Sequence, residues 1–205
     1  MEEIFVNTQS SIYIKNKYNI YIDPYLIQNS SKDADFIFIT HNHYDHFSKD
    51  DISKVINENT KVFVPSIIKE EFIDDSRFFA IEPNKEYLFK DMKVKTLYSY
   101  NINKPYHKKC SDNLGFLITV NNRSYYIVGD SDINPDIINV KADVLFVPIG
   151  GTYTMNYKEG AELSNIIKPK LVIPTHYGSI VGNKNDGEKF SKLLDKGIEY
   201  KLFDI

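Results

Sequence analysis

The sequence of 205 residues contains one cysteine and no tryptophan. One cysteine, Cys110, excludes an internal disulfide framework and fits a reducing compartment. An excess of positive charge is also missing, because 25 lysines and arginines stand against 28 aspartates and glutamates, and the formal net charge is -3. With no basic block along the chain, this composition argues against a surface that coats nucleic acid.

Long hydrophobic runs are absent as well. No stretch of about eighteen apolar residues occurs, so the sequence predicts no membrane span. The N-terminal residues, MEEIFVNTQSS, carry two acids where a secretory signal would carry positive charge, and no apolar stretch follows them. We therefore expect a soluble, cytoplasmic protein.

The order of predicted elements indicates one domain over residues 1–205 with two sheets and helices outside them. A doubly wound sheet is the alternative, but the strand meander over residues 77–128 disfavours it. Runs rich in β-branched and aromatic residues predict the strands, and N-cap and periodicity signals predict the helices. The expected strands are residues 3–6, 10–15, 18–24, 35–40, 61–65, 77–82, 86–90, 92–100, 114–120, 124–130, 142–148, 170–174 and 198–203, and the expected helices are 48–57, 66–72, 157–168 and one that ends near 194.

Three of the five histidines lie within one short segment, DFIFITHNHYDHFSKDD, at residues 35–51. Side chains two apart in an extended segment point the same way, so His41 and His43 can converge on one metal ion at the strand end. Asp45 and His46 come where the chain turns into a helix, and they can reach a second point nearby. Imidazole suits zinc, iron, nickel or copper, and a carboxylate also accommodates manganese. A site with no cysteine and more ligands than one tetrahedral ion needs is atypical of structural zinc.

A polar loop without function is the alternative interpretation of these histidines. Chance rarely produces the pattern H-x-H-x-D-H in a chain with five histidines, however. The segment also follows a buried strand, and ligands of layered α/β proteins usually bind at that edge. The sequence therefore favours a metal site.

The segment THNHYDHFS resembles the H-x-H-x-D-H signature of the metallo-β-lactamase superfamily. NIYIDPYL and YYIVGDSD are similar to the strand-Asp and Gly-Asp motifs of that family, so the resemblance extends along nearly the whole chain. VLFVPIGGTYTM and LVIPTHYG are similar to the branch that contains L-ascorbate-6-phosphate lactonase-like proteins. The resemblance implies an α/β fold, a four-layer αββα sandwich of two mixed sheets with outer helices, and a dinuclear metal site at its edge.

The resemblance also implies the metal ligands. For His107 the alternative is an ordinary loop histidine, because it lies several residues beyond the predicted strand end. For Asp130 the alternative is a turn residue, and for His176 a buried core residue. Two divalent ions are expected, with zinc first and manganese or iron as alternatives. The implied ligands are His41, His43 and His107 for the first ion, Asp45, His46 and His176 for the second, and Asp130 between the two.

The chemistry implied by the resemblance is hydrolysis by a water that two cations share and activate. Asp45 is the expected catalytic residue, which orients the attacking water or accepts its proton. Asp23 is expected to orient a ligand histidine without touching metal, the alternative being a turn residue before Pro24. Tyr153 and Tyr177 are expected to contact substrate, or else to serve in packing.

The expected substrate is an ester, lactone, amide or phosphoester of a small molecule. A nucleic-acid-processing phosphodiesterase on the same scaffold is one alternative, which the absence of a basic tract and of an inserted domain disfavours. A non-catalytic metal-binding protein is another. It stays open because the chain has Gln9 where related sequences often carry a histidine, and an amide cannot titrate. The sequence also leaves open whether the chain forms a homo-oligomer.

Overall fold

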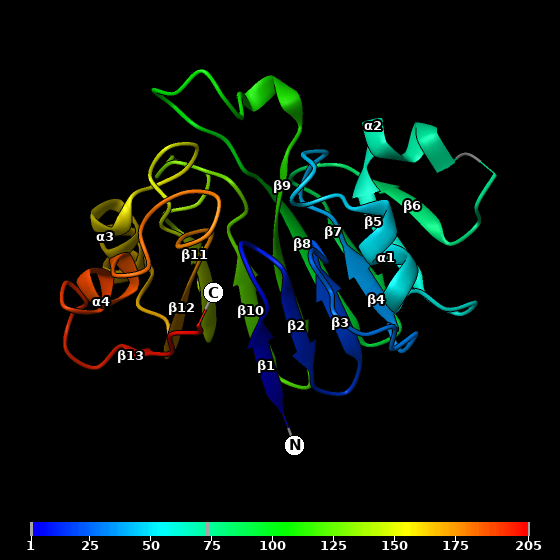
Figure 1. Ribbon diagram of the computed structural model, residues 1–205, viewed down its shortest axis with the longest axis horizontal. Helices are drawn as coiled ribbons and strands as arrows, with labels where there is room; N and C mark the ends of the chain where they lie inside the picture. Colours follow the sequence, from blue (N-terminus) through cyan, green and yellow to red (C-terminus); the bar gives the residue numbers. More distant parts are fainter. Residues whose placement is uncertain (1, 73, 205) are drawn as a thin grey trace.

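The structure is a computed structural model, and it describes residues 2–72 and 74–204. Two sheets lie face to face with helices on their outer sides (Figure 1). The expected α/β sandwich of two mixed sheets with outer helices is confirmed. Among the described residues, no helix combines the length and the apolar character needed to cross a membrane.

The first sheet contains six strands in chain order. Its first three strands are antiparallel, and the last four, from β3 to β6, are parallel. The strands are β1 (Glu3–Val6), β2 (Ile12–Lys15), β3 (Asn19–Ile22), β4 (Phe36–Phe38), β5 (Lys61–Pro65) and β6 (Phe78–Ile81).

The second sheet contains seven strands in the order β13-β12-β11-β10-β9-β8-β7. It is antiparallel from β7 to β10 and parallel from β10 to β13. The strands are β7 (Glu86–Phe89), β8 (Met92–Tyr98), β9 (Leu114–Val120), β10 (Arg123–Ile127), β11 (Val144–Pro148), β12 (Leu171–Thr175) and β13 (Glu199–Tyr200).

The outer layers are short helices. On the first sheet lie α1 (Lys49–Val55) and α2 (Ser66–Lys69), and on the second sheet lie α3 (Tyr157–Ile167) and α4 (Asp186–Ser191) (Figure 1). The predicted N-cap of α1 is present, because Ser48 Oγ accepts a hydrogen bond from the backbone N–H of Asp51 at 3.2 Å. The 3-10 helices are η1 (Glu70–Phe72) and η2 (Lys109–Ser111).

Several elements are shorter than the sequence predicts. The strand expected at residues 198–203 contains only Glu199–Tyr200, and the last helix ends at Ser191 instead of near 194. The strand expected at 35–40 ends at Phe38, where the chain leaves the sheet toward the histidine segment. Apolar composition does not reveal such ends, because residues such as Ile39 are buried although they lie beyond the last strand residue.

Burial explains why β4 has a continuous apolar sequence. All three of its residues are buried, because the second sheet covers one face of β4 and α1 and α2 cover the other. In contrast, β8 alternates buried and exposed residues near the open edge of its sheet. The core between the sheets contains stacked aromatic rings. The Phe38 ring lies 5.0 Å from that of Phe63 in the same sheet and 5.2 Å from that of Phe116 in the opposite sheet.

We expect the substitution Phe38→Ala to lower the free energy of unfolding by about 3–5 kcal/mol, because it removes a buried ring and leaves a cavity between the sheets. Urea unfolding followed by circular dichroism would measure this change. The matched control is Phe79→Ala, which removes a ring that is 36% exposed, and it should cost about 1 kcal/mol. An equal loss in both variants would contradict the assignment of this inter-sheet core.

Candidate metal centre

The candidate metal centre lies at the edge where the parallel strands of both sheets end (Figure 1). In the first sheet, Asp23 follows β3 and the segment 39–46 follows β4. In the second sheet, Asp130 follows β10 and His176 follows β12, while His107 comes from the long connection between β8 and β9. Parallel strands present their carboxyl ends at one edge, so residues far apart in sequence meet there.

The first group of ligand atoms consists of ring nitrogens of three histidines, His41, His43 and His107. His43 Nδ1 lies 3.0 Å from His41 Nε2 and 3.1 Å from His107 Nε2. His41 and His107 are buried, whereas His43 is exposed. This group therefore opens toward solvent on the side of His43.

The second group consists of Asp45, His46 and His176. Asp45 Oδ2 lies 3.7 Å from His46 Nε2 and 3.5 Å from His176 Nε2. All three residues are buried. The structure thus brings together in one place the two sets of residues that the sequence predicts for two separate ions.

Asp130 lies between the two groups. Its Oδ2 is 3.6 Å from His107 Nε2 and 3.2 Å from His176 Nε2, and its Oδ1 is 3.5 Å from His46 Nε2. The preceding Gly129 has a φ of 71°, and a Cβ there would lie 2.8 Å from Ser99 Oγ. A glycine is therefore required for the turn that carries the Asp130 carboxylate into the cluster.

Hydrogen bonds at the Nδ1 atoms of His41 and His107 determine that the Nε2 atoms of these rings direct lone pairs at the cluster. Thr40 Oγ1 donates to Asp23 at 2.6 Å, so it accepts from His41 Nδ1 at 2.9 Å. His107 Nδ1 donates to the carbonyl oxygen of Tyr153 at 3.1 Å. His41 Nε2 and His107 Nε2 therefore face His43 Nδ1 without hydrogens of their own. A cation satisfies three converging ring nitrogens of this kind, whereas one hydrogen cannot.

The residues of the cluster fit divalent ions. Ligands about 2.0–2.1 Å from a tetrahedral zinc lie about 3.3 Å from each other, close to the 3.0 and 3.1 Å between the ring nitrogens of the first group. In addition, His46 Nε2 and Asp130 Oδ1 are buried without a hydrogen-bond partner among the described residues. Buried polar atoms are rarely left unpaired, so these two atoms point to a bound ion.

Asp23 orients the ligand segment from behind. It is fully buried, and its Oδ2 accepts a hydrogen bond from His46 Nδ1 at 2.7 Å. Its Oδ1 accepts one from the backbone N–H of Thr40 at 2.8 Å. These contacts leave His46 Nε2 directed at the cluster, which is the arrangement expected of a carboxylate that supports a metal-binding histidine.

The two tyrosines predicted to contact substrate occupy different environments. The Tyr177 side chain is buried in the core beneath α3 and α4, with its hydroxyl against Gly187, so this position favours packing. Tyr153 is half-buried, and its ring lies 4.8 Å from that of Tyr106. Its carbonyl oxygen, however, holds His107 Nδ1. Substrate contact by either side chain stays a prediction.

The sequence did not reveal the residues that hold the His107 loop. Asn101 Nδ2 donates to the carbonyl oxygen of Tyr153 at 2.6 Å, the same atom that holds His107. Asp132 accepts a hydrogen bond from the backbone N–H of Ile102 at 3.1 Å and forms an ion pair with Lys104. The polar motif GDSD was the available signal for Asp132, but its partners lie about thirty residues away in the chain.

Burial and neighbouring charges shift the pKa values of His41, His46 and His107 in different directions. Burial lowers the pKa of His41 well below its ordinary value, and it also lowers the pKa of His107. Burial acts in the same direction on His46, but the charges of Asp130 and Asp23 outweigh it and hold the pKa of His46 well above the ordinary value. Without a bound ion, burial therefore favours the neutral form of His41 and His107, whereas the neighbouring carboxylates favour the protonated form of His46.

Comparisons with known proteins point to one family. A family model described as Beta-lactamase superfamily domain matches residues 5–176. A UPF0173 protein of Pyrococcus abyssi is 32% identical over 177 residues, which cover 83% of this chain and 80% of the relative. A UPF0173 metal-dependent hydrolase of Nanoarchaeum equitans is 32% identical over 204 residues, which cover 93% of this chain and 91% of the relative.

Among solved structures, a candidate metal-dependent hydrolase from Parabacteroides distasonis has the same fold. The TM-score is 0.83, and the superposition covers 100% of this chain and 99% of that chain. At 22% sequence identity, this likeness concerns the fold alone.

If the cluster binds the two zinc ions that the sequence predicts, we expect the substitution Asp23→Asn to weaken binding of the second ion by about 10–100-fold, because His46 loses the carboxylate that orients its ring. Titration of the chelator-treated protein with Zn²⁺ against a chromophoric competitor would measure both affinities. Asp91→Asn, at an exposed ion pair with Lys17, is the control and should leave them unchanged. Equal second-ion affinity in Asp23→Asn and the control would contradict this role of Asp23.

The raised pKa of His46 predicts that zinc displaces a proton from this residue at pH 7. Removing the Asp23 charge lowers that pKa, so Asp23→Asn should release fewer protons per chain than the unchanged protein, by up to about one. The difference should disappear as the pH rises through the His46 pKa of the folded protein. Calorimetric titrations in buffers of different ionisation enthalpy would count the protons, and equal release at pH 7 would argue against the assigned charge.

Proposed function

The chain belongs to the metallo-β-lactamase superfamily, in which it is a metal-dependent hydrolase, and we propose that it works with two divalent ions held by the cluster described above. Zinc is the ion that we propose first, because histidine nitrogens dominate the ligand set, and manganese or iron are alternatives. The first ion is assigned to His41, His43 and His107, the second to Asp45, His46 and His176, and Asp130 is assigned to both.

The position of Asp130 is the observation that carries the two-ion proposal. Its carboxylate oxygens lie within 3.6 Å of a ring nitrogen from each group, His107 on one side and both His46 and His176 on the other. A single tetrahedral ion needs four ligands, whereas this cluster offers seven residues. A carboxylate between two sets of ligands is therefore best explained by two ions.

Both carboxylates of the cluster are ionised at neutral pH. Burial tends to raise the pKa of Asp130, but the charges of His176 and His46 hold that pKa well below its ordinary value. Burial acts in the same way on Asp45, and a hydrogen bond with His176 and the charge of His46 lower that pKa. An ionised Asp45 can accept a proton, which supports its proposed role as the catalytic base.

When bound, the two ions would lower the pKa of a water molecule and polarise the substrate oxygen. The chain contributes the rest of the reaction. Asp45 orients the attacking water and takes its proton, while Asp23 and the Tyr153 carbonyl keep the rings of His46 and His107 in place. The exposed His43 leaves the first group accessible from solvent, so we assign substrate entry to that side.

The proposed substrate is a small molecule with an ester, lactone, amide or phosphoester bond. The resemblance to lactonase-like proteins supports a lactone within this group. Exposed aromatic side chains flank the ligand residues, with Tyr44 between His43 and Asp45 and Tyr106 directly before His107. Such rings suit an organic group better than a polyphosphate backbone, which would need lysine or arginine side chains. The exposed thiol of Cys110 supports the proposed reducing, cytoplasmic location.

We expect chelator to abolish hydrolysis by the purified protein, and Zn²⁺ or Mn²⁺ to restore it, on a panel of chromogenic esters, lactones and phosphodiesters. His41→Ala and Asp130→Ala should each lower kcat/KM by more than about 100-fold, because loss of a ligand exceeds the usual effect of losing an orienting residue. Asp136→Ala, at a partly exposed ion pair with Lys109, is the matched control. Full activity in His41→Ala and Asp130→Ala would refute the proposal.

A further inference from the structure

Gln9 is a buried polar residue in the turn between β1 and β2. The turn is closed by backbone hydrogen bonds, from Asn7 N to Ser11 O and from Ser11 N to Thr8 O, both at 2.9 Å. Gln9 is fully buried and has a φ of 48°, a left-handed backbone conformation that is uncommon for residues with a side chain. The turn therefore holds this amide in the interior in spite of an unfavourable backbone geometry.

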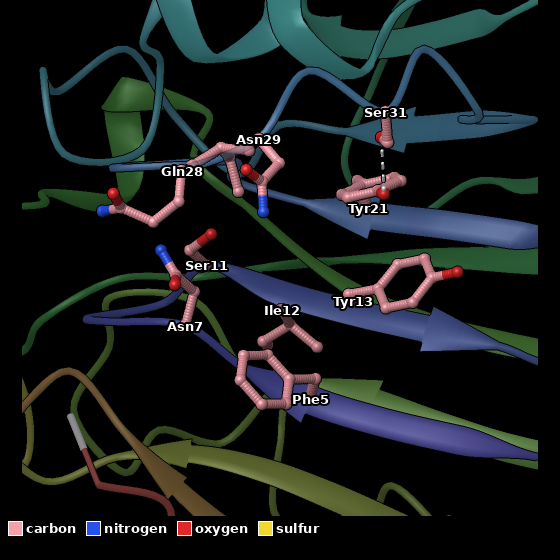
Figure 2. A pocket seen from close by; sticks show the side chains of 10 residues that line it. Phe5, Asn7, Ser11, Ile12, Tyr13, Tyr21, Gln28, Asn29 and Ser31 are labelled. Carbon is pink, nitrogen blue, oxygen red and sulfur yellow. Dashed lines mark hydrogen bonds between the residues drawn. The ribbon is translucent and has the colours of Figure 1, made fainter.

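Asn7 and Ser11, which lie in the same turn as Gln9, face away from the metal cluster and contact Tyr25. Asn7 and Ser11 line a pocket on the outer side of β1 to β3 (Figure 2). The volume of this pocket is about 370 Å³. Asn7 Nδ2 donates to the carbonyl oxygen of Tyr25 at 2.8 Å, and Ser11 Oγ accepts from the Tyr25 N–H at 3.0 Å. These residues fasten the turn to the loop after β3. Gln9 does not line the pocket and instead approaches the metal cluster.

Gln9 contacts two members of the second group of ligands. Its side-chain Nε2 lies 3.5 Å from Asp45 Oδ2, and its backbone carbonyl oxygen accepts a hydrogen bond from the backbone N–H of His176 at 2.9 Å. Asp45 Oδ2 is the same oxygen that lies 3.5 Å from His176 Nε2. The carboxylate determines the orientation of the amide, because only the NH₂ side can face an ionised oxygen.

The carbonyl side of the Gln9 amide faces no hydrogen-bond donor within residues 2–72 and 74–204. Gln9 Oε1 is buried and accepts no hydrogen bond from the described residues. An unpaired buried acceptor destabilises a fold, and an apolar side chain of similar length would remove this penalty. Packing alone would favour an apolar residue at this position. The contact of the NH₂ group with Asp45 Oδ2 therefore explains why an amide is present.

We propose that Gln9 is a positioning residue for the second ion. Its side-chain N–H orients the Asp45 carboxylate toward that ion. This inference rests on the proposed two-ion centre. The Gln9 side chain acts through Asp45, which follows β4 of the first sheet, and the Gln9 backbone carbonyl oxygen holds His176 at the end of β12. The second ion then depends on a residue of the N-terminal turn as well as on its own ligands.

The test is a Zn²⁺ titration of the metal-free Gln9→Met variant. Methionine matches glutamine in length and lacks both the donor and the unpaired acceptor. We expect the second ion to bind about 10–100-fold more weakly and the first ion to bind as before. We also expect the midpoint of urea unfolding of the metal-free variant to be equal or higher, which a merely structural role of Gln9 would not produce.

Two further variants serve as comparisons. Gln9→Asn keeps an amide and suits the left-handed backbone, but it is one methylene shorter, so it should also lose second-ion affinity. Ser11→Ala removes the acceptor of the Tyr25 N–H, and it should lower the unfolding midpoint without changing the ratio of the two affinities.

Wild-type affinity for both ions in Gln9→Met and Gln9→Asn would overturn the inference while leaving the two-ion centre intact. So would an equal loss of both ions in either variant. If the unchanged protein binds only one Zn²⁺ per chain, the proposed two-ion centre fails and this inference fails with it.

Discussion

The buried carboxylate of Asp23 is the interaction on which the candidate metal centre depends. It joins the end of β3 to the turn after β4, because it accepts hydrogen bonds from Thr40 N, Thr40 Oγ1 and His46 Nδ1. Four of the seven cluster residues come from that turn. Thr40, which Asp23 holds in place, contacts His41 Nδ1 of the first group. His46, which Asp23 contacts directly, belongs to the second group. One carboxylate therefore sets the orientation of rings in both groups.

The sandwich determines why the remaining ligands meet this turn. Each sheet has an antiparallel part and a parallel part, and the parallel strands of both sheets end at the same edge. The backbone N–H of Leu114 donates to the carbonyl oxygen of Thr40, which joins the two sheets directly at the cluster. The aromatic core between the sheets fixes their separation, so Asp130 and His176 approach the first sheet at a constant distance.

The histidine segment could be predicted from the sequence because its spacing is local. Residues two apart in an extended chain share a face, and the pattern at His41, His43, Asp45 and His46 depends on little else. The glycine before Asp130 and the buried strand before the cluster could also be identified from the sequence. The contacts of Asn101 with the Tyr153 carbonyl and of Asp132 with Ile102 were not, because they join segments whose relative position only the fold defines. The packing of Tyr177 against Gly187 has the same origin.

Backbone conformation adds a constraint that composition does not show. Four non-glycine residues at the centre have left-handed backbone conformations: Gln9, Asp23, His107 and His176 have φ values of 48°, 45°, 51° and 56°. Such conformations cost on the order of 1–3 kcal/mol each and persist where the surrounding structure enforces them. The cluster also contains buried polar atoms, such as His46 Nε2, that have no hydrogen-bond partner in the part of the chain that the structure describes.

The core must therefore be stable enough to hold an unfavourable site before any ion binds. An ion that binds only the folded chain offsets this cost by mass action, by about 4 kcal/mol at a concentration 1,000 times its Kd. Packing of the core therefore sets the geometry of the ligands, and ion binding offsets the free energy that this geometry costs the folded chain.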